Sequence, residues 1–504
     1  MALTAVAGLW ALVAAGCASP ETTLPPATSM PSASSPAASL SSSGCTLPND
    51  SPYSGAPAGL GLDARGATAP VWSARIGRPQ AVEGDRSFGI ASVGSSGTGC
   101  VVATDLASGQ ILWATRPPAD HPEILGVIAD STTVLAAVGN QFGQAPAMVY
   151  GAATGLVAYD PATGALRWAF SFPADSQAIP AVLAGGVVVV TEADGTVVGL
   201  DEADGHQVWK DAARQICSCQ LGPLSPGAVP GGPLALSSTG QTEAVVGYGC
   251  LTTGGVEALN PMDGSTVWNW VVPKGWSLDT QMLTTVDTGP PTGDVAVVPI
   301  SLEPHANAPP VTAPAPTPVL TTVIGNPYGY SETNNVVVLD PTTGQPLWDL
   351  QRVAGQAIEV GGVGSLCILT DSGADCRTAS DGAARWSTSW PGKNASASAP
   401  ALSCVCAASA SGVLFVALAT NSAPTYPLEW YPTTPAGAFL LTALDLATGR
   451  TEATLTLPAY DVQSDHAVSL AVPPGVLLAA SGIVLVSPQF EETDVVEAFA
   501  VTTS

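Results

Sequence analysis

The chain has 504 residues, of which 11% are charged, and 40 acidic residues against 14 Lys and Arg give a formal net charge of −26. This charge excludes nucleic acid as an expected partner, because phosphate binding requires clustered cations, and it opposes direct adhesion to anionic lipid. The mean hydropathy of +0.31 does not indicate a membrane-spanning protein, since no segment of the mature chain has about 20 uninterrupted apolar residues.

The amino-terminal segment has the pattern of an export signal. Leu3 to Ala15 is an uncharged, mainly apolar run that is too short to span a bilayer as a mature helix. The sequence VAAGC that ends at Cys17 is similar to a bacterial lipobox, in which cleavage precedes the cysteine and its thiol carries the lipid. We therefore expect residues 1–17 to be a signal peptide and Cys17 to be the lipid attachment site. The alternative is a conventional signal peptide that is cut near Ala18.

The segment after Cys17 has the composition of a tether. Of the 27 residues from Ala18 to Gly44, 22 are Ser, Thr, Pro or Ala, which leaves too little apolar bulk for a folded core. We expect residues 18–64 to be a disordered tether and lead-in that holds a folded domain, residues 65–504, away from a membrane.

A motif repeats seven times in that domain. A strand-like run leads, usually through Asp or Asn, into a short polar turn closed by Gly, and in six copies Trp follows four residues later. Alternating apolar positions such as Val157 and Tyr159 predict a strand with one face buried, and the turn residues predict a β-hairpin. The copies are Gly99–Trp113, Gly155–Trp168, Gly195–Trp209, Gly254–Trp268, Asn334–Trp348, Gly373–Trp386 and Phe439–Ala453.

The spacing of the copies predicts repeated four-stranded units. Residues Pro180 to Gly195 supply two more strands before the third hairpin, and the shortest spacings between turn glycines are 38 and 41 residues. Small sheets that recur at this period bury their faces only when neighbours stack on them. The repeat resembles the PQQ-like, or quinoprotein-type, β-propeller repeat over residues 65–504. The resemblance implies an all-β fold of four-stranded antiparallel blades, with the recurring Trp residues packed between blades.

The two ends of the chain complete the count of blades. Val495–Phe499 repeats the strand before the turn and then stops, whereas Trp72 has no turn before it. We therefore expect eight blades, with the ring closed by pairing of the amino- and carboxyl-terminal strands.

The cysteines indicate an oxidising compartment, since ten are present in a chain with an export signal. Cys367 and Cys376 flank the turn at Asp371–Gly373, which favours a disulfide across a hairpin, and Cys45 is a candidate to join the tether to Cys100. Pairs at 217/219 and 404/406 leave a metal site open as an alternative, although zinc pairs are usually spaced by two or more residues. We expect no bound metal.

Sequence motifs of catalysis are missing. The chain has no Gly-x-Ser-x-Gly, His-Glu-x-x-His or complete Walker motif, and its four histidines are scattered, with His206 inside a predicted turn. The family includes quinone-dependent dehydrogenases, which typically add a vicinal cysteine pair, a catalytic Asp and a calcium shell. It also includes lipoproteins such as the propeller scaffold of the outer-membrane Bam complex. This sequence has no Cys-Cys pair, so we expect neither PQQ nor calcium as a cofactor.

Two insertions depart from the repeat and carry aromatic residues that we expect to be exposed. One extends from Gly289 to Asn335 and the other from Ala423 to Pro432. Loops on a rigid scaffold often carry binding function, and Tyr and Trp commonly anchor protein partners. The candidate partner-binding residues are Tyr328, Tyr330, Tyr426, Trp430 and Tyr431. The alternative is that these loops pack on their own aromatics or form a disordered proline-rich flap.

These observations predict a non-enzymatic binding or scaffolding module of the bacterial cell envelope. We expect it at the cell membrane, held on the extracytoplasmic face by lipid alone, with an envelope protein as partner. The alternative function is a PQQ-dependent oxidoreductase similar to alcohol dehydrogenases.

Overall fold

The computed structural model shows a chain built from β-strands, and its described residues include no helix. Accordingly, no helix in the described part is long and apolar enough to cross a membrane. The structure describes residues 45, 72–75, 77–92, 99–118, 123–139, 154–172, 178–192, 196–211, 234–238, 241–250, 253–273, 276–278, 284–287, 294–302, 334–353, 358–362, 365–369, 373–390, 406–410, 412–419, 439–457, 460–463, 469–472, 474–480, 483–488 and 495–500.

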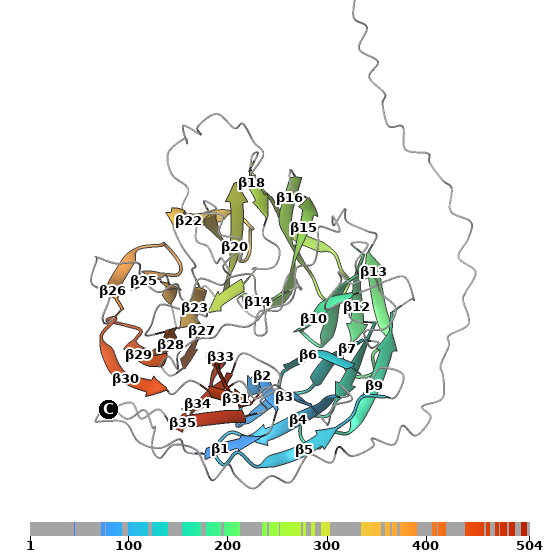
Figure 1. Ribbon diagram of the computed structural model, residues 1–504. Helices are drawn as coiled ribbons and strands as arrows, with labels where there is room; N and C mark the ends of the chain where they lie inside the picture. Colours follow the sequence, from blue (N-terminus) through green and yellow to red (C-terminus); the bar gives the residue numbers. More distant parts are fainter. Residues whose placement is uncertain are drawn as a thin grey trace, which may run out of the picture. The chain divides into compact units, whose positions relative to one another are not determined.

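Seven sheets follow one another along the chain, and in each the strands lie mostly in sequence order (Figure 1). We number them sheets 1 to 7. Sheet 1 contains β2 (Arg78–Glu83), β3 (Arg86–Ser92), β4 (Gly99–Asp105) and β5 (Ile111–Thr115). Sheet 2 contains β6 (Glu123–Ala129), β7 (Val134–Gly139), β8 (Gly155–Tyr159) and β9 (Leu166–Ser171). Sheet 3 contains β10 (Ala178–Ala184), β11 (Val187–Glu192), β12 (Val197–Asp201) and β13 (Gln207–Asp211).

The next four sheets repeat this pattern. Sheet 4 contains β14 (Leu234–Ser238), β15 (Gln241–Cys250), β16 (Thr253–Leu259) and β17 (Thr266–Val271). Sheet 5 contains β18 (Trp276–Leu278), β19 (Thr284–Asp287), β20 (Asp294–Leu302), β21 (Asn334–Leu339) and β22 (Pro346–Val353). Sheet 6 contains β23 (Ile358–Gly362), β24 (Ser365–Leu369), β25 (Gly373–Thr378) and β26 (Ala384–Ser389). Sheet 7 contains β27 (Cys406–Ala410), β28 (Val413–Ala419), β29 (Phe439–Asp445) and β30 (Thr451–Leu457).

The eighth large sheet joins the two ends of the described domain. Its order is β1 (Trp72–Arg75), β35 (Val495–Ala500), β34 (Ile483–Pro488) and β33 (Pro474–Ala480). β1 pairs with β35 in antiparallel register, with Trp72 opposite Ala498 and Arg75 opposite Val495. Figure 1 shows this pairing as a blue strand beside a red one. We call this the terminal sheet.

Three strands were not expected from the sequence. β19 pairs with β20 and makes sheet 5 five-stranded, while β31 (Tyr460–Gln463) and β32 (Ser469–Val472) form a two-stranded sheet of their own. β19 therefore lies between the fourth and fifth motif copies, whereas β31 and β32 follow the last copy.

The core lies between neighbouring sheets. One cluster of buried residues combines Leu135 and Leu156 of sheet 2 with Val188 and Leu200 of sheet 3, and Trp168 packs in the same cluster. Burial of these apolar faces is the main favourable contribution to stacking of the sheets.

The prediction of one buried face was wrong for the strand that contains Val157 and Tyr159. All five residues of β8 are buried, because neighbouring sheets cover both of its faces. β11 is likewise buried along its whole length. The alternation instead occurs on outermost strands such as β17, where Trp268 and Trp270 are buried and Val267 and Val271 are exposed.

Candidate functional site

The turn of each hairpin is held by its first residue. In sheet 2 the Asp160 carboxylate accepts hydrogen bonds from the backbone N–H of Ala162 (3.0 Å) and from the N–H and hydroxyl of Thr163 (2.9 Å each). Gly164 closes the turn with φ of 68° and donates its N–H to the Asp160 carbonyl at 2.8 Å. Hydrogen bonds from Arg167 and then from the Thr163 hydroxyl lower the pKa of Asp160. The carboxylate therefore already has a structural role.

Six tryptophans extend from the outermost strand of one sheet to the turn of the next. Trp168 of sheet 2 donates its Nε1–H to the carbonyl oxygen of Glu202 in sheet 3 at 2.8 Å. Its indole covers Gly205, where an added Cβ would lie 2.6 Å from the ring. The equivalent pairs are Trp113 with Pro161, Trp209 with Pro261, Trp268 with Pro341, Trp348 with Ala379 and Trp386 with Leu446. The acceptor is always the residue that follows the turn-opening position.

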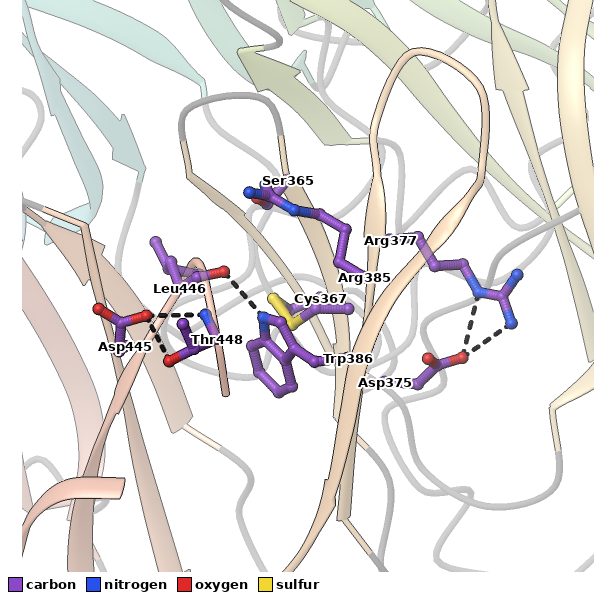
Figure 2. Close-up of a disulfide and its surroundings, with 10 residues drawn as sticks. Ser365, Cys367, Asp375, Arg377, Arg385, Trp386, Asp445, Leu446 and Thr448 are labelled. Carbon is purple, nitrogen blue, oxygen red and sulfur yellow. Dashed lines mark hydrogen bonds and ion pairs between the residues drawn. A yellow bond between two sulfur atoms is a disulfide. The ribbon is translucent and has the colours of Figure 1, made fainter. Parts of the chain in front are cut away.

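Figure 2 shows this contact between sheets 6 and 7. Trp386 donates to the Leu446 carbonyl at 2.8 Å, beside the turn in which Asp445 accepts the N–H and hydroxyl of Thr448 at 2.7 Å each. Cys367 lies behind the indole and forms a disulfide with Cys376, its direct partner in the register of β24 and β25. The disulfide and Leu446 belong to one buried cluster, and the partly buried indole of Trp386 packs against it. The hairpin disulfide therefore supports the surface on which sheet 7 packs.

A buried carboxylate adds a second contact between sheets 2 and 3. Glu202 is 7% exposed, and its Oε1 accepts hydrogen bonds from the hydroxyls of Thr132 and Thr133, the latter at 2.7 Å. Both threonines lie in the turn between β6 and β7, so this residue joins the sheets through its side chain and its carbonyl. The sequence analysis did not identify this role, because nothing in the local pattern distinguishes Glu202 from a solvated acid.

The indole contacts align the seven sheets. Each Trp lies four residues beyond the glycine of its own turn and donates to the turn of the following sheet. Consecutive turns therefore lie side by side, and the opposite ends of the same sheets define a second side of the domain. We call this second side the connection side.

Both candidate binding insertions join strands at the connection side. The first insertion, from Gly289 to Asn335, contains β20. Its remaining part joins β20 to β21 next to the Ser301–Asn334 pair, away from the turn that opens at Asp340. The second follows β28 and precedes β29, where Ala419 pairs with Phe439, away from the turn that opens at Asp445. The candidate residues Tyr328, Tyr330, Tyr426, Trp430 and Tyr431, and the lipobox residue Cys17, lie outside the described residues.

One turn brings together groups that are able to coordinate a metal. Ligand atoms of Asp201, Asp204 and His206 lie within 4.8 Å of one another in sheet 3. His206 Nδ1 lies 2.5 Å from Asp204 Oδ1, and this contact raises the pKa of the exposed imidazole. Asp201 and Asp204 also accept backbone N–H groups of their own turn. Hydrogen bonding within the turn accounts for this cluster.

Comparison with known proteins identifies the repeat. Residues 97–280 match the family model described as "Outer membrane protein assembly factor BamB". The matched part carries the PQQ-like propeller repeat, and it contains sheets 2, 3 and 4 together with β4 and β5 of sheet 1. No curated protein sequence matches the chain.

The chain also matches solved structures at low sequence identity. Sqt1 of Saccharomyces cerevisiae is 8% identical with a TM-score of 0.50, covering 89% of this chain and 100% of that one. BamB of Moraxella catarrhalis is 15% identical with a TM-score of 0.45, covering 86% and 99%. The quinohemoprotein alcohol dehydrogenase ADHIIG of Pseudomonas putida HK5 is 12% identical with a TM-score of 0.40, covering 72% and 63%.

Proposed function

We propose that this chain is a lipid-anchored, extracytoplasmic propeller that binds an envelope protein and catalyses no reaction itself. The observation that carries the proposal is the match of residues 97–280 to a family named for outer-membrane protein assembly. The geometry is consistent with it, because the repeated Asp, Gly and Trp residues are used in turns and in contacts between sheets. Binding is then assigned to the connections between strands.

The proposed domain is a closed ring of eight blades. Its support is the pairing of β1 with β35, which combines the two chain ends in one sheet. In that register Trp72 lies opposite Ala498, as Trp168 lies opposite Ala158 in sheet 2. The backbone therefore gives Trp72 the position that carries the indole in six other sheets.

The only motif copy without Trp is consistent with this closure. Ala453 of β30 pairs with Ala443 of β29, just as Trp386 of β26 pairs with Cys376 of β25. Ala453 therefore occupies the position that Trp has in the other copies. The sheet that follows sheet 7 is the terminal sheet, since β27 of sheet 7 contacts β33 of the terminal sheet. In the terminal sheet the last two strands come from opposite chain ends and share no turn. An indole at Ala453 would have no turn to bind.

The proposed partner site is the connection side, at the insertions that carry Tyr328, Tyr330, Tyr426, Trp430 and Tyr431. Two insertions on the same side of aligned sheets are able to contact one partner together. Tyr and Trp supply large contact areas at low entropic cost, and they are common among energetically dominant interface residues.

The decisive experiment separates binding from quinone chemistry. Purified protein is titrated with PQQ and Ca²⁺ while absorbance and fluorescence are recorded, and dye-linked alcohol oxidation is assayed in parallel. The proposal expects no saturable spectral change and no turnover, together with capture of a defined envelope protein by immobilised propeller. Stoichiometric quinone binding with turnover would replace it with the oxidoreductase alternative.

Membrane attachment is tested by Cys17→Ser. If Cys17 carries the lipid, the variant moves from the membrane fraction to the medium while the propeller remains folded. Mass spectrometry of the mature amino terminus gives the direct readout, and an unmodified terminus that begins after Cys17 would contradict the anchor.

A further inference from the structure

The segment that precedes the propeller is attached covalently to sheet 1. Cys45 forms a disulfide with Cys100 on β4, across a sequence separation of 55 residues. Cys45 also packs beside Ala91, Val102 and Ala114, which come from β3, β4 and β5. Its backbone N–H makes a long hydrogen bond of 3.5 Å with the Ala114 carbonyl. The attachment therefore extends over three strands of one sheet.

The strand nearest to this segment in the chain is held much less firmly. β1 has four residues and pairs only with β35 among the described strands, at the edge of the terminal sheet. The four residue pairs of this register are the backbone pairing that opposes a force on the free end of β1. β4, by contrast, is flanked by β3 and β5, and six of its seven residues are buried.

The disulfide places β1 inside a closed covalent loop. β1, β2 and β3 all lie between Cys45 and Cys100 in the sequence. A force applied to any residue before Cys45 therefore reaches the fold through Cys100 and β4, without passing through β1. Cys100 is the second residue of β4, at the end away from the Asp105 turn, so the attachment is on the connection side.

We propose that the Cys45–Cys100 disulfide transmits tension from the tether to β4 and so protects the proposed ring closure at β1. The biological need for it rests on the proposed lipid anchor, because a free amino terminus carries no sustained load. The disulfide also sets the tether length. The chain from Cys17 to Cys45 reaches about 100 Å at full extension, roughly half the reach from Cys17 to Trp72.

Single-molecule pulling tests the proposed load path. One handle is fixed to the mature amino terminus, and the second to a peptide tag inserted after Gly412, a turn glycine with open space around its Cβ position. The native protein is expected to show no extension step before the main unfolding event. The Cys45→Ser/Cys100→Ser variant is expected to open β1 first, at low force, in a step of about 20 Å, the length of the chain from Trp72 to the start of β2.

Two controls keep the result interpretable. Cys367→Ser/Cys376→Ser removes a disulfide that spans only 9 residues within one hairpin, and its first event is expected to match the native one. If the Cys45→Ser/Cys100→Ser variant does not fold, native protein is reduced while it is held under low force. The lengthening of about 100 Å from Cys45 to Trp72 is then scored apart from the later step of about 20 Å at β1. An early step in the oxidised native protein, or none after loss of the Cys45 disulfide, would overturn the proposal. An unmodified Cys17 would refute the anchor and leave the measured load path unchanged.

Discussion

Trp168 contributes to stability through burial and through one directed hydrogen bond. Its indole is 6% exposed, it covers Gly205 of the next sheet, and its Nε1–H is bound to the Glu202 carbonyl. Truncation of a buried aromatic residue typically costs about 3–5 kcal/mol. Six such contacts join consecutive sheets. The packing of each Trp therefore depends on the turn glycine of the following sheet.

The coupling predicts different costs for two chemically identical substitutions. Gly205 has φ of 74° and Gly412 has φ of 78°, so Gly→Ala strains the backbone at both sites by about 1–2 kcal/mol. Only at Gly205 does the new methyl overlap the Trp168 indole, which adds about 1–3 kcal/mol of overpacking. Denaturant unfolding should show Gly205→Ala to be the more destabilising. Equal losses would mean that the indole contact is not tight.

A buried acid in sheet 5 predicts a pH-dependent gain in stability. Asp349 is 8% exposed, its Oδ1 has no hydrogen-bond partner among the described residues, and burial raises its pKa to about 6. The ionised carboxylate therefore destabilises the fold above that pH. Asp349→Asn should raise the melting temperature at pH 7 to 8. The gain should shrink as pH falls through 6 and vanish near the ordinary value of 3.8, where the native carboxyl is neutral.

Asp445 provides the control of opposite sign. Its hydrogen bond from the Thr448 hydroxyl is the main cause of a lowered pKa, so its charge stabilises the fold above the ordinary value. Asp445→Asn should lower the melting temperature at neutral pH, with a loss that fades as pH falls below 4. A pH-independent effect at Asp349 would show that its carboxyl is not desolvated.

At the scale of single elements, the hairpins were predictable and their burial was not. Asp160 and Gly164 specify the turn through their own backbone chemistry, which needs no neighbour. The burial of β8 on both faces is imposed by neighbouring sheets, and the alternation of Val157 and Tyr159 does not encode it. The acceptor of the Trp168 indole is 34 residues away, so no local pattern identifies it.

The same contrast applies to the cysteines and to the short strands. The symmetric spacing of Cys367 and Cys376 around a turn indicated the pairing that the structure contains, since directly opposed residues of a hairpin lie close together. β31 and β32 have four residues each and offer too few alternating positions to be recognised. The insertions that carry the candidate binding aromatics are identified by composition alone, which does not define their contacts.

The hairpin disulfide should stabilise sheet 6 by a measurable amount. Removing a cross-link that closes a loop of 9 residues is expected to cost about 2–3 kcal/mol through unfolded-chain entropy. Cys367→Ala/Cys376→Ala should therefore lower the midpoint of thermal unfolding. An unchanged midpoint would mean that the pair is reduced in the native protein.

For the molecule as a whole, the proposed ring closure depends on the pairing of β1 with β35. Deletion of residues 495–504 removes β35 and leaves open edges on β1 and β34. This deletion should destabilise the entire domain, because each sheet buries its faces only against its neighbours. Deletion of residues 501–504 is the matched control and should leave the melting temperature unchanged. Equal stability of both truncations would contradict a closed ring.

The central claim is that the propeller binds an envelope partner through aromatic insertions on the connection side. The measurement is the affinity of the captured partner for Trp430→Ala/Tyr431→Ala, with Val267→Ala on the exposed face of β17 as control. The account predicts that the double variant loses more than ~1 kcal/mol of binding free energy at an unchanged melting temperature, while the control binds normally. A lower melting temperature with partner capture intact would show that these aromatics pack their own loop, and it would contradict the account.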